Sequence, residues 1–380
     1  MKTQFAVLAL ATAAIAASSP NRGGTGLTGP AALRTARVDV SAVGGSGERA
    51  VYTLTNRTSG NAVAIFTRAA DGRLTAAGTV STGGTGTGGG LGSQGALALN
   101  DAGQLLFAVN AGSNEISAFL VNPEGRLALA ARVASGGTQP ISLSAHGHLL
   151  YVLNAGGSGN INGFTIGADG ALSPIPGSTR PLTGTAVGPA QVAFSPDGRL
   201  LVVTEKTVNR IAVYTVGPDG VATGPTSVAS AGVRPFGFAF GQRDGLFVSE
   251  AAGTASSYQV GENGRLTVVS GAVATHQGAP CWLVVTTDGR FAYTANAHSG
   301  TISGFRVGPD ASLSLLDVSG QTAKVGAGNI DLALPTNGQY LYQLNGSGTI
   351  TALRVQDDGA LETIGVFGGL PAGVAGLAAR

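Results

Sequence analysis

The chain has 380 residues and a formal net charge of +2, from 22 Lys and Arg against 20 Asp and Glu. Because no run of basic residues accompanies this balance, we do not expect binding to nucleic acid through neutralisation of phosphates. The 62 glycines fall at turns between runs of Val, Ile, Leu and Phe, so the composition predicts a folded β-rich protein and not a low-complexity chain.

The first residues, MKTQFAVLALATAAIAASSP, have the pattern of a secretory signal peptide. Lys2 precedes an apolar run that ends in small residues suited to cleavage, and the run is too short for a membrane span. We therefore predict a signal peptide at 1–17, a flexible leader at 18–35 and one folded domain at 36–380, in a secreted or periplasmic protein. No later segment is long and apolar enough to cross a bilayer, and the lone Cys281 excludes an intrachain disulfide.

The folded domain begins with a strand pattern, VYTLTN at 51–56, and the tract TGGTGTGGGLGSQG at 82–95 follows, which we interpret as a long mobile loop. A repeat then becomes clear from two copies, PAQVAFSPDGRLLVVTEKTVNRIAVYTVGPDG at 189–220 and PCWLVVTTDGRFAYTANAHSGTISGFRVGPD at 280–310. Each copy has an apolar strand, a DG turn, a second apolar strand that ends in a polar residue, a polar loop, a third strand and another turn. Four strands per unit with such turns are typical of a propeller blade.

Seven copies align on the polar residue that ends the second strand, and they are spaced 44 to 54 residues apart. These residues are Asn56, Asn110, Asn154, Glu205, Glu250, Asn296 and Asn345. The turn after the third strand is DG, EG or NG in six copies, whereas the sixth copy has Asp310-Ala311. The spacing predicts a seven-bladed β-propeller.

The C-terminal segment has the pattern of the strand that the first copy lacks. The first copy lacks its first strand, and LPAGVAGLAA at 370–379 resembles the missing one. We therefore predict an all-β fold with four-stranded antiparallel blades, in which the C-terminal strand joins the first blade. Such a closure removes the open sheet edges that a linear array would expose.

The first strands of the blades start, and the second strands end, on the same face of the ring. We call it the first face, and we predict the functional site at its central mouth, where several blades present polar groups to one cavity. The candidate substrate-binding residues are Gln191, Asn154, Glu250, Trp282, Asn296 and Asp331. An Asn at a strand end also commonly bonds its own loop backbone, which is the structural alternative.

Three residues are candidates for catalysis. Glu205 is a potential general base or ligand anchor. Arg234 could bind a carboxylate through its guanidinium group, and His276 could act as an acid or base. The alternatives are a plain ion pair of Glu205 with Lys206, Arg210 or Arg234, a surface role for Arg234, and a solvated loop position for His276.

Other chemistry has little support in the sequence. Trp282 could stack on a ligand or pack in the core, and Cys281 has no evident paired base, which favours a buried thiol. We find no metal-ligand cluster, phosphate loop or nucleophile elbow, and we expect no metal and no cofactor. Glycosylation acceptor triplets start at Asn56 and Asn345.

The units PAQVAFSPDGRLLVVTEKTVNRIAVY and DGRFAYTANAHSGTISGFRV resemble blades of the lactonase family of seven-bladed β-propellers, which includes 6-phosphogluconolactonases and carboxy-cis,cis-muconate cyclases. The run GGGLGSQGALALNDAGQLLFAVNAGSNEISAF at 88–119 is similar to exported, 3-carboxymuconate cyclase-like members. The resemblance covers essentially the whole ring. It implies carbohydrate or muconate-type lactone chemistry.

One departure concerns the fourth blade. Lactonases of this family typically carry Arg-His after the Gly-Pro that opens this blade, and a Glu at the end of its second strand. Here Gly188-Pro189 is followed by Ala190-Gln191, while Glu205 matches the Glu position. Without the pair, the groups that could polarise a lactone carbonyl and move a proton are missing.

Two functions follow as hypotheses. The first is an exported enzyme that hydrolyses or forms a lactone of a sugar acid or muconate-type compound, with Glu205 as base or anchor and Arg234 on the substrate carboxylate. The second is a non-catalytic exported propeller that binds a small lactone or carboxylate, or an extracellular protein, at the same mouth. Convergence of Glu205, Arg234 and His276 in one pocket would favour the enzyme. We expect a monomer.

Overall fold

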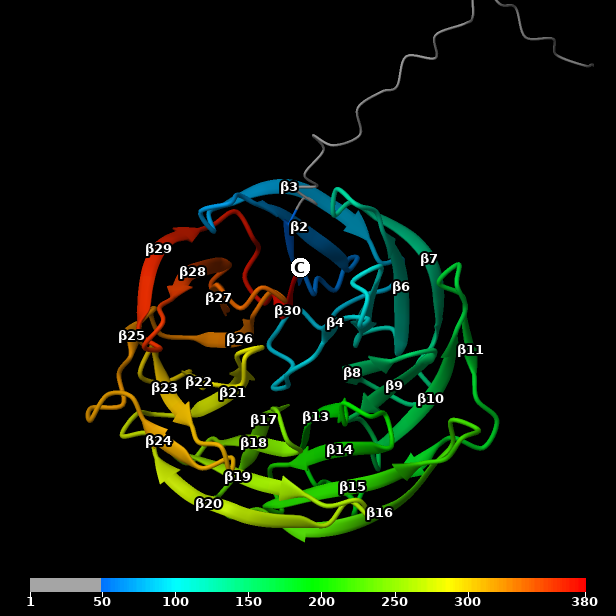
Figure 1. The fold of residues 1–380 in the computed structure, drawn as a ribbon. Helices are drawn as coiled ribbons and strands as arrows, with labels where there is room; N and C mark the ends of the chain where they lie inside the picture. The colour runs from blue at the N-terminus through cyan, green and yellow to red at the C-terminus, as the bar shows by residue number, and fades with distance from the viewer. Residues whose placement is uncertain (1–48) are drawn as a thin grey trace, which may run out of the picture. The chain divides into compact units, whose positions relative to one another are not determined.

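The computed structural model describes residues 49–380, which are all strands, turns and loops. The predicted signal peptide and leader lie outside the described residues. The strands form seven antiparallel sheets arranged in a ring (Figure 1), which confirms the predicted seven-bladed β-propeller.

Each sheet is one blade, and the strand bounds follow in blade order. The first three blades contain β30 (Ala375–Ala379), β1 (Arg49–Leu54), β2 (Ala62–Arg68) and β3 (Leu74–Ser81); β4 (Leu97–Leu99), β5 (Leu105–Asn110), β6 (Glu115–Val121) and β7 (Leu127–Ala134); and β8 (Pro140–His146), β9 (Leu149–Asn154), β10 (Asn160–Ile166), β11 (Leu172–Pro174) and β12 (Arg180–Pro181). The fourth and fifth contain β13 (Pro189–Phe194), β14 (Leu200–Glu205), β15 (Arg210–Val216) and β16 (Ala222–Ala229); and β17 (Pro235–Phe240), β18 (Gly245–Glu250), β19 (Thr254–Val260) and β20 (Leu266–Ala274). The last two contain β21 (Pro280–Val285), β22 (Phe291–Asn296), β23 (Thr301–Val307), β24 (Leu313–Leu315) and β25 (Ala323–Lys324); and β26 (Asn329–Ala333), β27 (Tyr340–Asn345), β28 (Thr349–Val355) and β29 (Leu361–Phe367).

The ring closes through its C-terminal strand, as the sequence predicted. β30 pairs antiparallel with β1, with Thr53 opposite Leu377 and Val51 opposite Ala379. In Figure 1, β30 lies at the centre of the ring, inside the blue strands of the first blade. The closure gives the first blade the same number of strands as the second.

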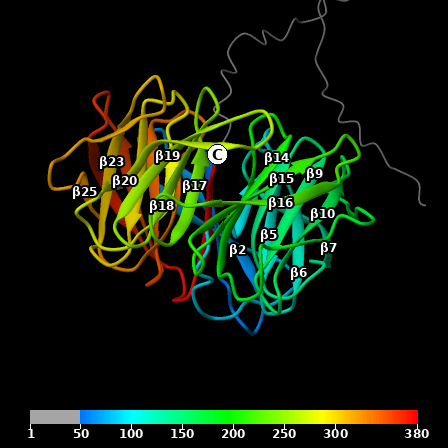
Figure 2. The ribbon, with the colours of Figure 1, turned by 90° about the horizontal axis from the view of Figure 1, so that it is seen from below.

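Burial along each blade follows the sequence pattern. Second strands such as LLVVTE in β14 and LLYVLN in β9 are buried at every residue, because neighbouring blades cover both of their faces. The outermost strands are largely exposed, as in LTAAGTVS of β3. Seen edge-on in Figure 2, the strands run across the thickness of the ring, so loops and turns emerge on its two faces.

The turns between third and fourth strands need a left-handed backbone. Gly220 has φ 77° and Gly359 has φ 93°, and glycine adopts such angles without the strain of a side chain. In the sixth blade Ala311 takes the same place at φ 66°. Several turns are also fixed by the neighbouring blade, since the Tyr293 hydroxyl of β22 donates to the Gly359 carbonyl at 2.8 Å.

Candidate functional site

The polar residues that end the second strands hold the linkers that arrive from the preceding blade. Asn154 Nδ2 donates to the Ser135 carbonyl at 3.3 Å, and Asn345 Nδ2 donates to the Ala327 carbonyl at 2.6 Å. All seven of these residues are buried. These two Asn side chains therefore have a structural role, as the alternative predicted, but the carbonyls that they bind lie in the preceding linker and not in their own loop.

The two glutamates in this series also bind the preceding linker, but they accept hydrogen bonds from it where the asparagines donate them. Glu205 Oε1 accepts the backbone N–H of Thr183 at 3.0 Å and also binds the hydroxyl of that threonine. Glu250 Oε1 accepts the N–H of Gly232 at 3.0 Å. A carboxylate can only accept hydrogen bonds, so it suits a linker that offers donors, whereas the amide of Asn suits a linker that offers a carbonyl.

The three predicted catalytic residues differ in exposure, and none of them lines either of the cavities described below. Glu205 is 0% exposed against its linker, whereas Arg234 and His276 are exposed side chains in the loops that precede β17 and β21. Among residues 49–380, no ion pair joins any two of the three. Burial raises the pKa of Glu250, but the hydrogen bonds of its carboxylate are already made within its own blade and linker.

Gln191 and Asp331 satisfy the free inner edges of neighbouring blades. Gln191 Oε1 accepts the Phe238 N–H at 2.7 Å, and its Nε2 donates to the Phe238 carbonyl at 3.0 Å. Asp331 Oδ2 accepts the Leu377 N–H of the closing strand at 3.0 Å. An innermost strand has no further strand to pair with, so its backbone groups need such partners.

Asn296 also has a local role. Its Nδ2 donates to the hydroxyls of Thr301 and Ser303, both at 2.9 Å. The side chain is 0% exposed. The buried amides of Asn56 and Asn345, at the two acceptor triplets, are likewise engaged by backbone carbonyls.

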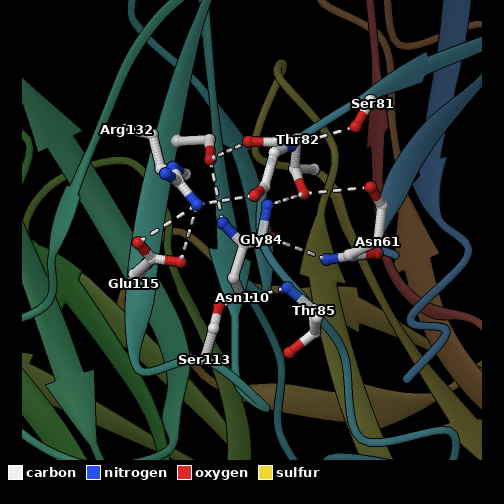
Figure 3. A network of polar contacts seen from close by, with 11 residues as sticks. Asn61, Ser81, Thr82, Gly84, Thr85, Asn110, Ser113, Glu115 and Arg132 are labelled. Atoms are coloured by element: carbon white, nitrogen blue, oxygen red, sulfur yellow. Dashed lines mark hydrogen bonds and ion pairs between the residues drawn. The ribbon is translucent and has the colours of Figure 1, made fainter. Parts of the chain in front are cut away.

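The glycine-rich tract at 82–95 is held in place, although its composition suggested a mobile loop. In its first part, the Thr82 hydroxyl donates to the Asn61 carbonyl at 3.0 Å, and Asn61 Nδ2 donates to Asn110 Oδ1 at 3.1 Å (Figure 3). Gly84 fits here because a Cβ would lie 2.5 Å from Asn110 Cγ. These contacts fix the beginning of the tract between the first two blades.

Residues 88–94, which we call the strap, continue across the first-face mouth. Gln94 Nε2 donates to the Leu283 carbonyl at 2.8 Å and its Oε1 accepts the Leu283 N–H at 3.0 Å, so the strap is clamped to the sixth blade. The Ser93 hydroxyl donates to the Ile141 carbonyl of the third blade at 2.8 Å. Long-range bonds of this kind give the strap a fixed path.

Two cavities flank the strap on the first face. One, of about 280 Å³, is walled by Trp282, Phe236 and Ile330 together with the strap. The other, of about 260 Å³, is walled by Ile141, Leu182 and Lys206 and again by the strap. Of the nine residues predicted from sequence, Trp282 lines the first cavity, and the other eight are not among the walls of either.

Trp282 is packed against its neighbours, as one of its two predicted roles required, and it also borders the first cavity. Its indole Nε1 donates to the Ser93 carbonyl of the strap at 2.9 Å, and its ring packs edge-on against Phe236 with centroids 5.3 Å apart. The side chain is 6% exposed. It therefore supports the strap and forms an apolar wall at the same time.

Lys206 is the cation among the residues that line the two cavities, and the sequence indicated it only as a possible ion-pair partner of Glu205. Its Nζ donates to the Gly92 carbonyl of the strap at 2.5 Å and lies 4.7 Å from the centroid of the Phe236 ring. No carboxylate within residues 49–380 lies within 4.0 Å of it. Burial lowers the pKa of Lys206 and raises that of the nearby Cys281 thiol to about 12. The Cys281 thiol is therefore protonated at neutral pH.

Two further features of the described ring bear on its chemistry. Residues 49–380 contain no group of three or more His, Cys, Asp or Glu side chains placed to hold a metal ion. No helix in that range is long and apolar enough to span a membrane.

Comparison with known proteins agrees with this architecture. The sequence profile of the lactonase family of seven-bladed β-propellers matches residues 46–187, 158–276 and 245–368. The chain therefore belongs to this family. No curated protein matches the chain.

Solved structures with the same fold are distant in sequence. A proposed 6-phosphogluconolactonase from Bacteroides fragilis is 18% identical, with a TM-score of 0.72 over 90% of this chain and 100% of that one. A periplasmic gluconolactonase from Pseudomonas aeruginosa is also 18% identical, with a TM-score of 0.66 over 87% of this chain and 99% of that one. At such identities the likeness establishes the fold.

Proposed function

We propose that this lactonase-family propeller binds a small lactone, or the carboxylate of the corresponding hydroxy acid, at its first-face mouth. The observation that carries the proposal is the ammonium group of Lys206, which lies at the mouth with no carboxylate of residues 49–380 within 4.0 Å. A partly desolvated cation of this kind favours an anionic or carbonyl ligand, because the Gly92 carbonyl offers it only a dipole and the ligand supplies further acceptors or a negative charge.

The positions of the other charged groups favour binding over turnover. Ring opening of a lactone by water needs a base for the water and a group that stabilises the oxyanion. Lys206 can stabilise the oxyanion, but Glu205 is hydrogen-bonded to Thr183, and Ala190 and Gln191 replace the family's Arg-His pair. Hydrolysis is the second candidate, and membership of the lactonase family favours it.

The chain offers a matched pair of variants for the test, since Lys206 and Lys324 are its two lysines within residues 49–380. Calorimetric titration with benzoate, gluconate and δ-valerolactone measures binding, and pH-stat assay with the same lactone measures turnover. We expect Lys206→Met to weaken carboxylate binding by at least about tenfold, the effect of about 1.4 kcal/mol. Lys324→Met, which removes an exposed ammonium group, should leave it unchanged.

The outcomes separate the candidates. Turnover that is lost in Lys206→Met would establish the enzyme and place its chemistry at the mouth. Binding without turnover would support the non-catalytic propeller. No binding of any probe, or equal binding by both variants, would contradict the proposal and turn attention to a protein partner.

Export is part of the same proposal, and it rests on the N-terminal pattern of the sequence. N-terminal sequencing of the protein recovered from the periplasm or the medium tests it. A mature chain that begins near residue 18 supports export, and a protein confined to the cytoplasm with Met1 intact contradicts it.

A further inference from the structure

The strap is a wall of both cavities at the mouth, and Leu91 is the strap residue that borders both. Within GGGLG at 88–92, Leu91 is the single large side chain. It borders both cavities. It also packs against the core clusters that contain Leu143 and Ile141 of the third blade. Leu91 therefore separates the two cavities.

The strap and the ring are shaped for each other. A Cβ on Gly237 of the fifth blade would lie 2.1 Å from Gln94 Oε1, so the clamp on the sixth blade requires glycine there. At the other end of the strap, Asn56 Nδ2 donates to the Gly89 carbonyl at 2.6 Å. Because both ends are bonded, Leu91 is held at a defined place in the mouth.

The walls of the first cavity are mainly apolar, whereas the second cavity also has Ser158 and glycine backbone beside Lys206. Apart from Lys206, their larger side chains are apolar: Trp282, Phe236 and Ile330 in one, Ile141 and Leu182 in the other. Inner-edge side chains such as Gln191 and Asp331 are bonded to backbone and do not line them. In the first cavity a polyhydroxylated ligand would lose hydrogen bonds to water and replace few of them, which costs binding energy. A phosphate group would bring a second negative charge to a single cation.

We propose that Lys206 and the strap together select a small monocarboxylate with an apolar body, or its lactone, over polyhydroxylated and phosphorylated acids. This inference rests on the proposed function and specifies its ligand class. Lys206 binds the carboxylate, the apolar walls cover the body, and Leu91 limits its size. The cavities, about 280 and 260 Å³, lie below the usual range of about 300–1,000 Å³ for drug-sized ligands.

Calorimetric titration of the full chain with four probes tests the ligand class: benzoate, 2-naphthoate, gluconate and 6-phosphogluconate. We expect benzoate to bind at least about tenfold more tightly than gluconate, since burial of an apolar body contributes about 25 cal/mol per Å². 6-Phosphogluconate should bind no more tightly than gluconate.

Leu91 variants test the role of the strap. Leu91→Ala joins the cavities and should shift the preference from benzoate towards 2-naphthoate by about fivefold or more. Leu91→Phe keeps an apolar side chain at this partly buried position and narrows the site, so it should weaken the binding of benzoate. Leu129→Ala, at a position that is 44% exposed on β7, serves as the control and should change neither affinity.

Failure of this inference is distinguishable from failure of the proposed function. If gluconate binds as tightly as benzoate while Lys206→Met still weakens both, the apolar ligand class is wrong and the anion site stands. If both Leu91 variants keep the benzoate to naphthoate ratio of the parent protein, the strap does not select the ligand. If Lys206→Met has no effect on any probe, both proposals fall.

Discussion

Replacement of Gln191 by alanine distinguishes a structural clamp from a ligand contact at the channel. The sequence predicted Gln191 as a substrate-binding residue, whereas the structure places both ends of its amide on the backbone of Phe238. A ligand-binding residue can be removed without loss of stability. A buried clamp cannot, because the strand that it holds loses both hydrogen bonds.

The size of the effect follows from the two bonds. Gln191→Ala leaves the N–H and the carbonyl of Phe238 buried without partners, and each such group costs about 1–3 kcal/mol. We expect a loss of about 3 kcal/mol in the free energy of unfolding. With an unfolding entropy of about 2.1 cal/mol/K per residue, a ring of this length should then melt about 4 °C lower.

Thermal unfolding followed by far-ultraviolet circular dichroism measures this shift. Gln242→Ala is the control, because Gln242 is exposed on the other face of the ring, and we expect it to change stability by less than about 0.5 kcal/mol. A Gln191→Ala protein that melts with the parent and loses carboxylate binding would refute the clamp and restore the role predicted from sequence.

Three further changes test the ring itself. Tyr293→Phe removes the hydroxyl bonded to Gly359 and should lower the free energy of unfolding in urea by about 1 kcal/mol; an unchanged midpoint would contradict a stabilising role for this bond. Gly359→Ala should cost more than about 2 kcal/mol in the same assay, since its Cβ would lie 2.5 Å from Phe291 and its φ is 93°; a cost below that of Tyr293→Phe would show that the turn adapts. Burial raises the pKa of Asp331 well above its ordinary value, so the folded protein keeps a proton that the unfolded chain releases above about pH 4, and stability falls as pH rises towards the folded pKa. Asp331→Asn should flatten this dependence in urea midpoints compared at pH 5 and 8, and the same slope in both proteins would contradict the raised pKa.

The fold was predictable because its determinants are local and repeated. The run LLVVTE at 200–205 is apolar enough to be covered on both faces, and the turn glycines mark where each hairpin reverses. Repetition of these signals set the number of blades. The likeness of 370–379 to a missing first strand also predicted how the ring closes, since an unpaired inner strand would leave β1 as a free edge.

The partners of the polar side chains were not predictable, because they lie in other blades or linkers. Glu205 bonds to Thr183, which reaches it from the preceding linker. Gln94 bonds to Leu283, which is 189 residues away in the chain. A strand-end carboxylate has the same sequence pattern whether it faces a ligand or a linker.

The glycine-rich composition of 82–95 predicted a mobile loop, whereas the structure holds the strap in place through hydrogen bonds to other blades. Sequence determined the strands, the turns and the blades, because each depends on residues close together in the chain. Tertiary structure decided that a glycine-rich tract lies fixed across the mouth, that Leu91 divides it and that Lys206 faces it, because those positions depend on hydrogen bonds and packing between blades. Glu205 and Lys206 are neighbours at the end of one strand but have different roles. Glu205 binds a linker, and Lys206 lines a cavity.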